Sequence, residues 1–138
     1  MIRVKIVSVG KTKESWLVEA ISDYQNRLRS AVAFEFVWVK DNEELLSKLE
    51  KEPAYLLLDS KGSMMTSEAF ASFFYKEAES RGARLCFVIG GAEGLPASLK
   101  APALSFSLLT FTHQMIRLLL VEQIYRATEI FKGSAYHK

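Results

Sequence analysis

The sequence predicts an α/β domain with a mostly parallel sheet and helices on both faces. Segments with strand patterning alternate with amphipathic helical segments along the whole chain. Two strand segments, 54–59 and 85–89, are continuous apolar runs, which is typical of parallel strands covered on both faces. No repeat, low-complexity segment or linker interrupts the alternation, so we expect residues 1–138 to form a single domain.

The first third of the chain carries two strand patterns and one helix pattern. Residues 2–9 alternate apolar and polar side chains over most of their length, which predicts a strand ending before Gly10. Residues 14–29 place apolar side chains at helical spacing and predict an amphipathic helix. Residues 34–39 are aromatic or β-branched apart from one glutamate, which favours a second strand.

A short helix and a buried strand are expected next. Asp41 and Glu44 have the spacing of a capping box, so a helix should begin there and end before Pro53. The apolar run 54–59 closes on an acid and predicts a buried strand. Small and polar residues at 60–63 then predict a loop.

The third quarter of the chain repeats this order. Residues 67–81 carry phenylalanines on one helical face, and Gly82 follows as a stop. Residues 85–89 predict another buried strand that leads straight into the glycine-rich stretch 90–94. Residues 96–103 form an irregular or helical link to the last elements.

The last quarter combines a strand, a hinge and the most strongly predicted helix. Residues 104–108 alternate apolar and small polar side chains, and 109–113 form the hinge. Residues 114–132 contain no glycine or proline, and Gly133 stands just beyond them, which predicts a helix over that range. The tail 134–138 ends in tyrosine, histidine and lysine.

Bulk composition narrows the class of protein. The 138 residues are 49% hydrophobic and 25% charged, which is typical of a globular chain, and the net charge of +2 does not by itself indicate a nucleic-acid binder. The single cysteine, Cys86, lies in an apolar run and is interpreted as a buried structural thiol. No signal peptide or membrane-length apolar run is present, so a cytoplasmic protein is expected.

The C-terminal helix predicts a homodimer. Its first half, 115–121, is apolar nearly all round and needs cover from the sheet on one side and from a second copy on the other. Arg117 is the one cation in that half; it pairs either with a carboxylate or phosphate, or across the dimer interface. Glu122 and Arg126 have the spacing of a helix-supporting ion pair.

Ligands bind beyond the carboxyl ends of strands in open α/β sheets, which points to the loops after Leu58, Ile89 and Leu108. The turn 90–94 has three glycines that permit close approach of a ligand, although a tight strand exit explains them equally well. Neither the dinucleotide-binding fingerprint nor a P-loop is present.

The uncharged segment before His113 is the second candidate. Its backbone groups can hydrogen-bond an adenine edge beside an apolar pocket, or the segment is plain core. His113 is interpreted as a satisfied polar residue and not as a base. No Cys/His cluster has metal-ligand spacing, so no metal is expected. The residues alone therefore indicate a small, dimeric α/β ligand-binding domain.

Four stretches carry a resemblance that extends over the whole chain: 87–95, 104–115, 121–127 and 135–138. Their order and spacing resemble the ribosomal RNA large subunit methyltransferase H family, small SPOUT-class enzymes that methylate N3 of a pseudouridine in bacterial 23S rRNA. The resemblance implies one SPOUT domain with a C-terminal trefoil knot. It also implies a homodimer through the C-terminal helix.

The resemblance implies S-adenosylmethionine as cofactor. The implied contacts are Leu58, Gly90, Phe106, Ser107, Leu108, Leu109, Thr110 and Phe111. The family commonly has proline where this chain has Thr112, which can still start the helix as an N-cap.

The tail supplies the catalytic candidates, Tyr136 and His137. The attacking imide nitrogen carries a proton, and histidine has the more suitable unperturbed pKa to remove it. In the alternative interpretation, the tail only clamps the pseudouridine by stacking and hydrogen bonding. The implied substrate is 23S rRNA within the ribosome, with neither metal nor membrane involved. Two other readings stay open: a SPOUT methyltransferase acting on tRNA, and a non-catalytic ribosome- or nucleotide-binding module.

Overall fold

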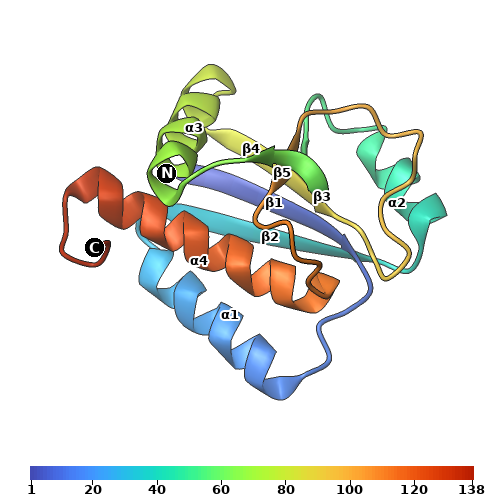
Figure 1. Cartoon of the computed structure of the whole chain (residues 1–138), viewed down its shortest axis with the longest axis horizontal. Helices are drawn as coiled ribbons and strands as arrows, with labels where there is room; N and C mark the ends of the chain where they lie inside the picture. The colour runs from blue at the N-terminus through green and yellow to red at the C-terminus, as the bar shows by residue number, and fades with distance from the viewer.

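The computed structural model describes residues 1–138 and contains nine helices and strands (Figure 1). In chain order they are β1 (Ile2–Val9), α1 (Ser15–Leu28), β2 (Val32–Val39), α2 (Asn42–Leu49), β3 (Leu56–Met64), α3 (Ser67–Ser80), β4 (Arg84–Ile89), β5 (Ala103–Ser105) and α4 (His113–Lys132). None of the helices is both long and apolar enough to cross a membrane.

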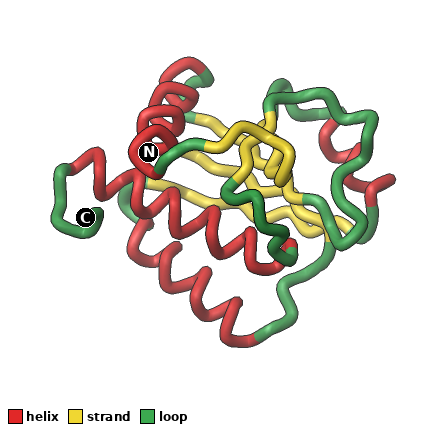
Figure 2. The backbone as a smooth tube through the Cα atoms, in the orientation of Figure 1, coloured by secondary structure: helices red, strands yellow, loops and turns green.

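The five strands form one sheet in the order β2-β1-β4-β3-β5, and every neighbouring pair is parallel. This confirms the predicted α/β class. All strands therefore end at the same edge of the sheet. In Figure 2 the longer loops gather at that end of the molecule, away from the C-terminal tail.

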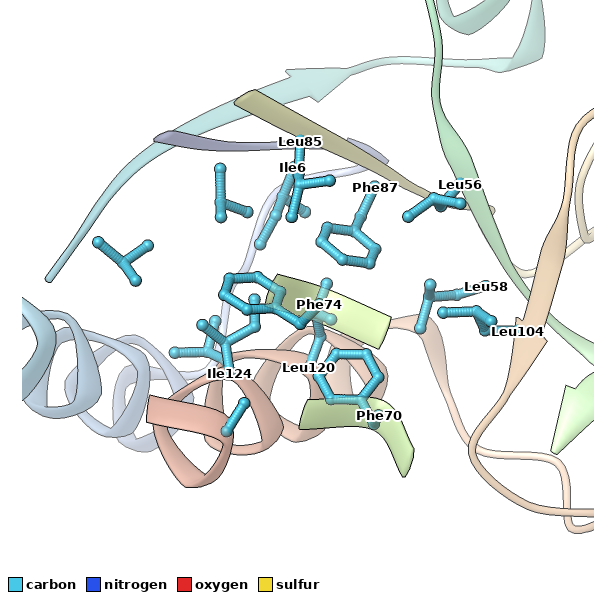
Figure 3. Close-up of a cluster of buried hydrophobic side chains, with 14 of the residues drawn as sticks. Ile6, Leu56, Leu58, Phe70, Phe74, Leu85, Phe87, Leu104, Leu120 and Ile124 are labelled. Atoms are coloured by element: carbon cyan, nitrogen blue, oxygen red, sulfur yellow. The ribbon is translucent and has the colours of Figure 1, made fainter. Parts of the chain in front are cut away.

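Helices cover both faces of the sheet, as predicted. On one face α4 lies between α1 and α3 and packs against both (Figure 1). Figure 3 shows this layer, where Phe74 of α3 and Leu120 and Ile124 of α4 lie close to the strand residues. On the other face Leu45 and Leu49 of α2 cover a smaller apolar cluster. The larger cluster fixes the position of α4 relative to the strand ends.

The boundaries of α4 follow from its caps. The Oγ1 atom of Thr112 accepts a hydrogen bond from the backbone N–H of Met115 at 3.2 Å, so Thr112 is the N-cap. Gly133 ends the helix in the left-handed conformation with φ +73°. The helix begins one residue earlier than predicted and stops at Lys132 as predicted.

Two predictions near β3 and β5 were wrong. The expected loop 60–63 is strand, because β3 continues to Met64 and its end pairs with Leu104 and Ser105 after a register shift. Gly62 permits this pairing, since a Cβ there would lie 2.6 Å from the carbonyl carbon of Ala103. The expected strand 104–108 is shorter and ends at Ser105. Both errors arise from backbone pairing between distant segments, which local patterning does not encode.

Candidate active site

Three strands lie side by side at the carboxyl edge of the sheet. Leu58 of β3 pairs with Ile89 of β4 and with Leu104 of β5. The chain after each of these residues turns toward the others, and the three segments surround a cavity of about 690 Å³. A cavity of this size suits a cofactor. It is lined by 58–61, 89–95, 104–107, 109–113 and Ile116.

The glycine turn forms one wall of the cavity. The backbone N–H of Gly94 donates to the carbonyl of Gly91 at 3.0 Å, and Gly94 has φ +80°. A Cβ on Gly90 would lie 2.8 Å from the carbonyl carbon of Gly94 and 2.9 Å from the nitrogen of Leu95. Glycine is therefore required at 90 by close backbone packing, and at 94 by the left-handed conformation.

The loop between β5 and α4 forms the opposite wall, and its hydroxyl groups shape it. The Oγ of Ser105 donates to the carbonyl of Ser107 at 2.8 Å. The Oγ of Ser107 in turn accepts from the N–H of Leu109 at 3.0 Å. The backbone groups of Thr110 and Phe111 form no hydrogen bond within the chain. This wall thus offers unpaired amide donors and acceptors to a ligand.

Charged and titratable groups also line the cavity. Asp59, Lys61 and Glu93 are among them, and the Asp59 carboxylate accepts from the N–H of Lys61 at 3.0 Å. His113 lies at the start of α4, where burial and then the positive charge of Arg117 lower its pKa. His113 is therefore neutral at physiological pH. Asp59 and Glu93 are negative, Lys61 is positive and His113 is neutral, so the charges that line the cavity sum to −1, which favours a cationic ligand.

The structure brings most of the predicted cofactor residues together. Leu58, Gly90, Phe106, Ser107, Leu109, Thr110 and Phe111 all line the cavity. Leu108 does not, and its side chain is 79% exposed. The sequence reasoning missed Asp59, Lys61, Glu93 and His113, although each stands within a few residues of a predicted strand end.

The two catalytic candidates lie elsewhere. Tyr136 and His137 do not line the cavity, and the tail folds back beside α4 (Figure 1). The Tyr136 hydroxyl donates to the Glu122 carboxylate at 2.8 Å, and the Tyr136 ring contacts Arg126 and Tyr125. Burial and the Glu122 hydrogen bond raise the pKa of Tyr136. The phenol is thus a proton donor in this arrangement, which argues against Tyr136 as the base.

Both ring nitrogens of His137 are engaged. A guanidinium can only donate and a carboxylate only accept, so Nδ1 accepts from Arg126 Nη1 at 3.1 Å and Nε2–H donates to Glu68 at 2.6 Å. Arg126 also forms the predicted ion pair with Glu122, with 2.9 Å between Nη2 and Oε2. His137 must leave Arg126 before it can accept a proton.

The prediction for Arg117 was wrong. Its side chain is fully buried inside its own chain and pairs with no carboxylate. Cys86 is buried as predicted, and burial raises its thiol pKa to about 12. No group of three or more His, Cys, Asp or Glu side chains is placed to hold a metal ion.

Comparison with known proteins places the chain in a family. A family model described as "Predicted SPOUT methyltransferase" matches residues 2–137. A protein of Protochlamydia amoebophila named ribosomal RNA large subunit methyltransferase H is 55% identical over 140 aligned residues, which cover 100% of both chains. A protein of the same name from Coprothermobacter proteolyticus is 39% identical over 99% of this chain and 99% of its own length. Another from Bacillus pumilus is 36% identical over 98% of this chain and 99% of its own length. The chain therefore belongs to the SPOUT methyltransferase family.

Proposed function

We propose that this protein is an S-adenosylmethionine-dependent methyltransferase that methylates N3 of a pseudouridine in 23S rRNA of the large ribosomal subunit. Family membership and three full-length relatives named as large-subunit rRNA methyltransferases support the reaction and the substrate. The observation that carries the proposal is the cavity where β3, β4 and β5 end, with a glycine turn on one wall and unpaired backbone groups on the other.

The residues present fit S-adenosylmethionine. The backbone of Thr110 and Phe111 has free donors and acceptors for an adenine edge, and Leu58, Leu109 and Ile116 supply apolar surface. The carboxylates of Asp59 and Glu93 complement a cationic ligand. When bound, S-adenosylmethionine supplies a methyl group on a positively charged sulfur, which is lost as a neutral thioether.

The chain contributes mainly alignment and proton removal. The glycine turn and the loop before α4 would hold the cofactor in this cavity, and positioning of this kind contributes roughly 7–11 kcal/mol. Transfer of that methyl group to N3, with the thioether as leaving group, would also require removal of the proton that N3 carries. His137 is the better candidate to take it, because burial and the Glu122 hydrogen bond raise the pKa of Tyr136 and keep its phenol a proton donor.

The active site is proposed to be shared between two copies of the chain. The cavity lies at the start of α4 and the tail beyond its end, and a helix of 20 residues is about 30 Å long. Within one chain, Tyr136 and His137 are held by Glu122, Arg126 and Glu68, and neither lines the cavity of that chain. In a homodimer the tail of one copy can reach the cavity of the other. Met115 and Leu119, one turn apart on α4 and only partly buried, supply apolar surface for that contact.

The chain is further proposed to act as one cytoplasmic domain, residues 1–138, with the trefoil knot of its family. Membership of the SPOUT methyltransferase family supports the knot. Single-molecule pulling from the two termini tests it. A knotted chain stays shorter at full extension than an unknotted chain of equal length.

Transfer of radiolabelled methyl groups tests the function. The purified protein is incubated with labelled S-adenosylmethionine and, in parallel, with 70S ribosomes, isolated large subunits, free 23S rRNA or tRNA from cells that lack the enzyme. Label on ribosomal 23S rRNA, mapped to N3 of a pseudouridine, is the expected result. Label on tRNA alone would establish the tRNA alternative, and no label on any substrate would favour a non-catalytic module.

A further inference from the structure

Arg117 is a buried cation whose hydrogen bonds are all satisfied by neutral groups. Its Nε donates to Ser8 Oγ at 2.9 Å, and its Nη1 donates to Thr12 Oγ1 at 3.0 Å and Gln114 Oε1 at 3.3 Å. Its Nη2 donates to the carbonyl oxygens of Val9 and Gly10 at 2.8 and 2.6 Å. These five contacts use all five N–H donors of the guanidinium.

Core packing does not explain a charge at this position. Arg117 is 0% exposed and forms no ion pair, and burial lowers its pKa to about 10, so the group stays charged. Only the face of the Trp38 ring, 4.4 Å from the guanidinium carbon, offers further electrostatic support. An aliphatic side chain, like the neighbouring Leu120, would fill the space without the cost of desolvation.

The contacts of Arg117 join two segments that are far apart in the sequence. On one side are the end of β1 and the turn after it, Ser8 to Thr12. On the other side is the first turn of α4, through Gln114, whose amide also donates to the carbonyl of Lys11 at 2.8 Å. Arg117 thus ties the carboxyl edge of the sheet to the start of the helix.

Both joined segments abut walls of the cavity. A Cβ on Gly91 would lie 3.0 Å from Val9 Cγ1, so the end of β1 packs directly on the glycine turn. A Cβ on Gly10 would lie 3.7 Å from His113 Nε2, and His113 itself lines the cavity. Arg117 itself does not line the cavity, so its guanidinium lies behind the two walls.

We propose that Arg117 is a positioning residue of the cofactor site: by holding the end of β1 against the first turn of α4, it sets the distance between the glycine turn and the loop that precedes α4. The proposal rests on the proposed function, in which S-adenosylmethionine occupies this cavity. A planar fork of five donors is needed because the acceptors are two backbone carbonyls and two short hydroxyl groups in residues 8–12 and one amide oxygen, that of Gln114, in α4.

The test measures S-adenosylmethionine affinity by calorimetry and unfolding temperature in the same full-length variants. Arg117→Met removes every donor and should weaken binding at least tenfold. Arg117→Lys keeps the charge with three donors and should recover part of that loss. Leu28→Ala is the matched control: Leu28 is buried at the end of α1, away from the strand ends, so its variant should lose stability without losing affinity.

A milder variant covers the case in which Arg117→Met does not fold. Thr12→Val removes one acceptor, and the cofactor KM should rise severalfold while the KM for ribosomes stays constant. Wild-type affinity in folded Arg117→Met, or a loss no larger than in Leu28→Ala, would overturn the proposal. An unchanged cofactor KM in Thr12→Val would overturn it as well. Absence of binding to the wild-type protein is a different result, because it removes the proposed function itself.

Discussion

Substituting alanine for Gly90 tests the cofactor site most directly. The added Cβ would lie 2.8 Å from the carbonyl carbon of Gly94, whereas carbon atoms pack at about 3.5 Å, so the turn must open by roughly 0.7 Å. Backbone cannot rotate away as a side chain can, and overpacking of this kind costs about 1–3 kcal/mol. At about 4 °C per kcal/mol, the unfolding temperature should fall by roughly 4–12 °C.

The larger effect should be on binding, because a displacement above about 0.5 Å spoils a preorganised site. We expect affinity for S-adenosylmethionine to fall at least tenfold, about 1.4 kcal/mol, in calorimetry below the unfolding transition. Gly82→Ala is the control: Gly82 has φ +63° at the end of α3 with no neighbour within 4 Å of an added Cβ. It should lose stability and keep its affinity. Wild-type affinity in folded Gly90→Ala would show that the cofactor binds elsewhere.

Three further predictions concern the dimer, the tail and pH. Leu119→Glu should dissociate the homodimer in sedimentation velocity, because it places a charge on partly buried apolar surface; a wild-type protein that sediments as a monomer at micromolar concentration would contradict this. Deletion of 136–138 should leave cofactor binding intact and severely lower the turnover of methyl transfer, and full activity would exclude the tail from the mechanism. His137→Ala should alter the pH–rate profile if His137 is the base, and lower the rate uniformly if it is a clamp. The folded state lowers the pKa of His113 below 6.5, so the unfolded chain binds that proton more readily and the free energy of unfolding should fall as pH drops below 6.5. Urea unfolding should show a weaker fall in His113→Gln, and an equal fall would assign the pH dependence to other groups.

The predicted fold was largely correct because most elements are specified locally. Helix α4 has helix-forming residues between a threonine N-cap and a left-handed glycine, and both ends lie within one residue of the prediction. The buried run in β4 was likewise visible as an apolar segment between Arg84 and the glycines at 90 and 91. The end of β3 was missed because Ser60–Ser63 has no strand propensity and is held by pairing with β5, more than 40 residues away along the chain.

Part of the candidate site could likewise be predicted from the sequence, and part of it could not. The sequence determined which segments reach the cavity, because ligands bind where parallel strands end and the glycines mark a close backbone approach. It also placed the polar tail beyond the helix stop. Position along a chain, however, does not determine which distant groups meet. Asp59, Glu93 and His113 lie around one cavity only because β3, β4 and α4 are neighbours in space.

Arg117 and the tail show most clearly what only the tertiary structure decided. In the sequence Arg117 is a cation on an apolar helix, and a partner chain is a reasonable place for its charge. In the structure the helix is rotated so that this side chain points at the end of β1 and the turn after it, which supply four neutral acceptors, and Gln114 of the same helix supplies a fifth. The tail folds back onto Glu122 and Arg126, which lie about 14 and 20 Å along α4 from His113 at the cavity. Helical periodicity determines which residues share a face of a helix. The packing of the whole core determines where that face points and therefore which groups it contacts.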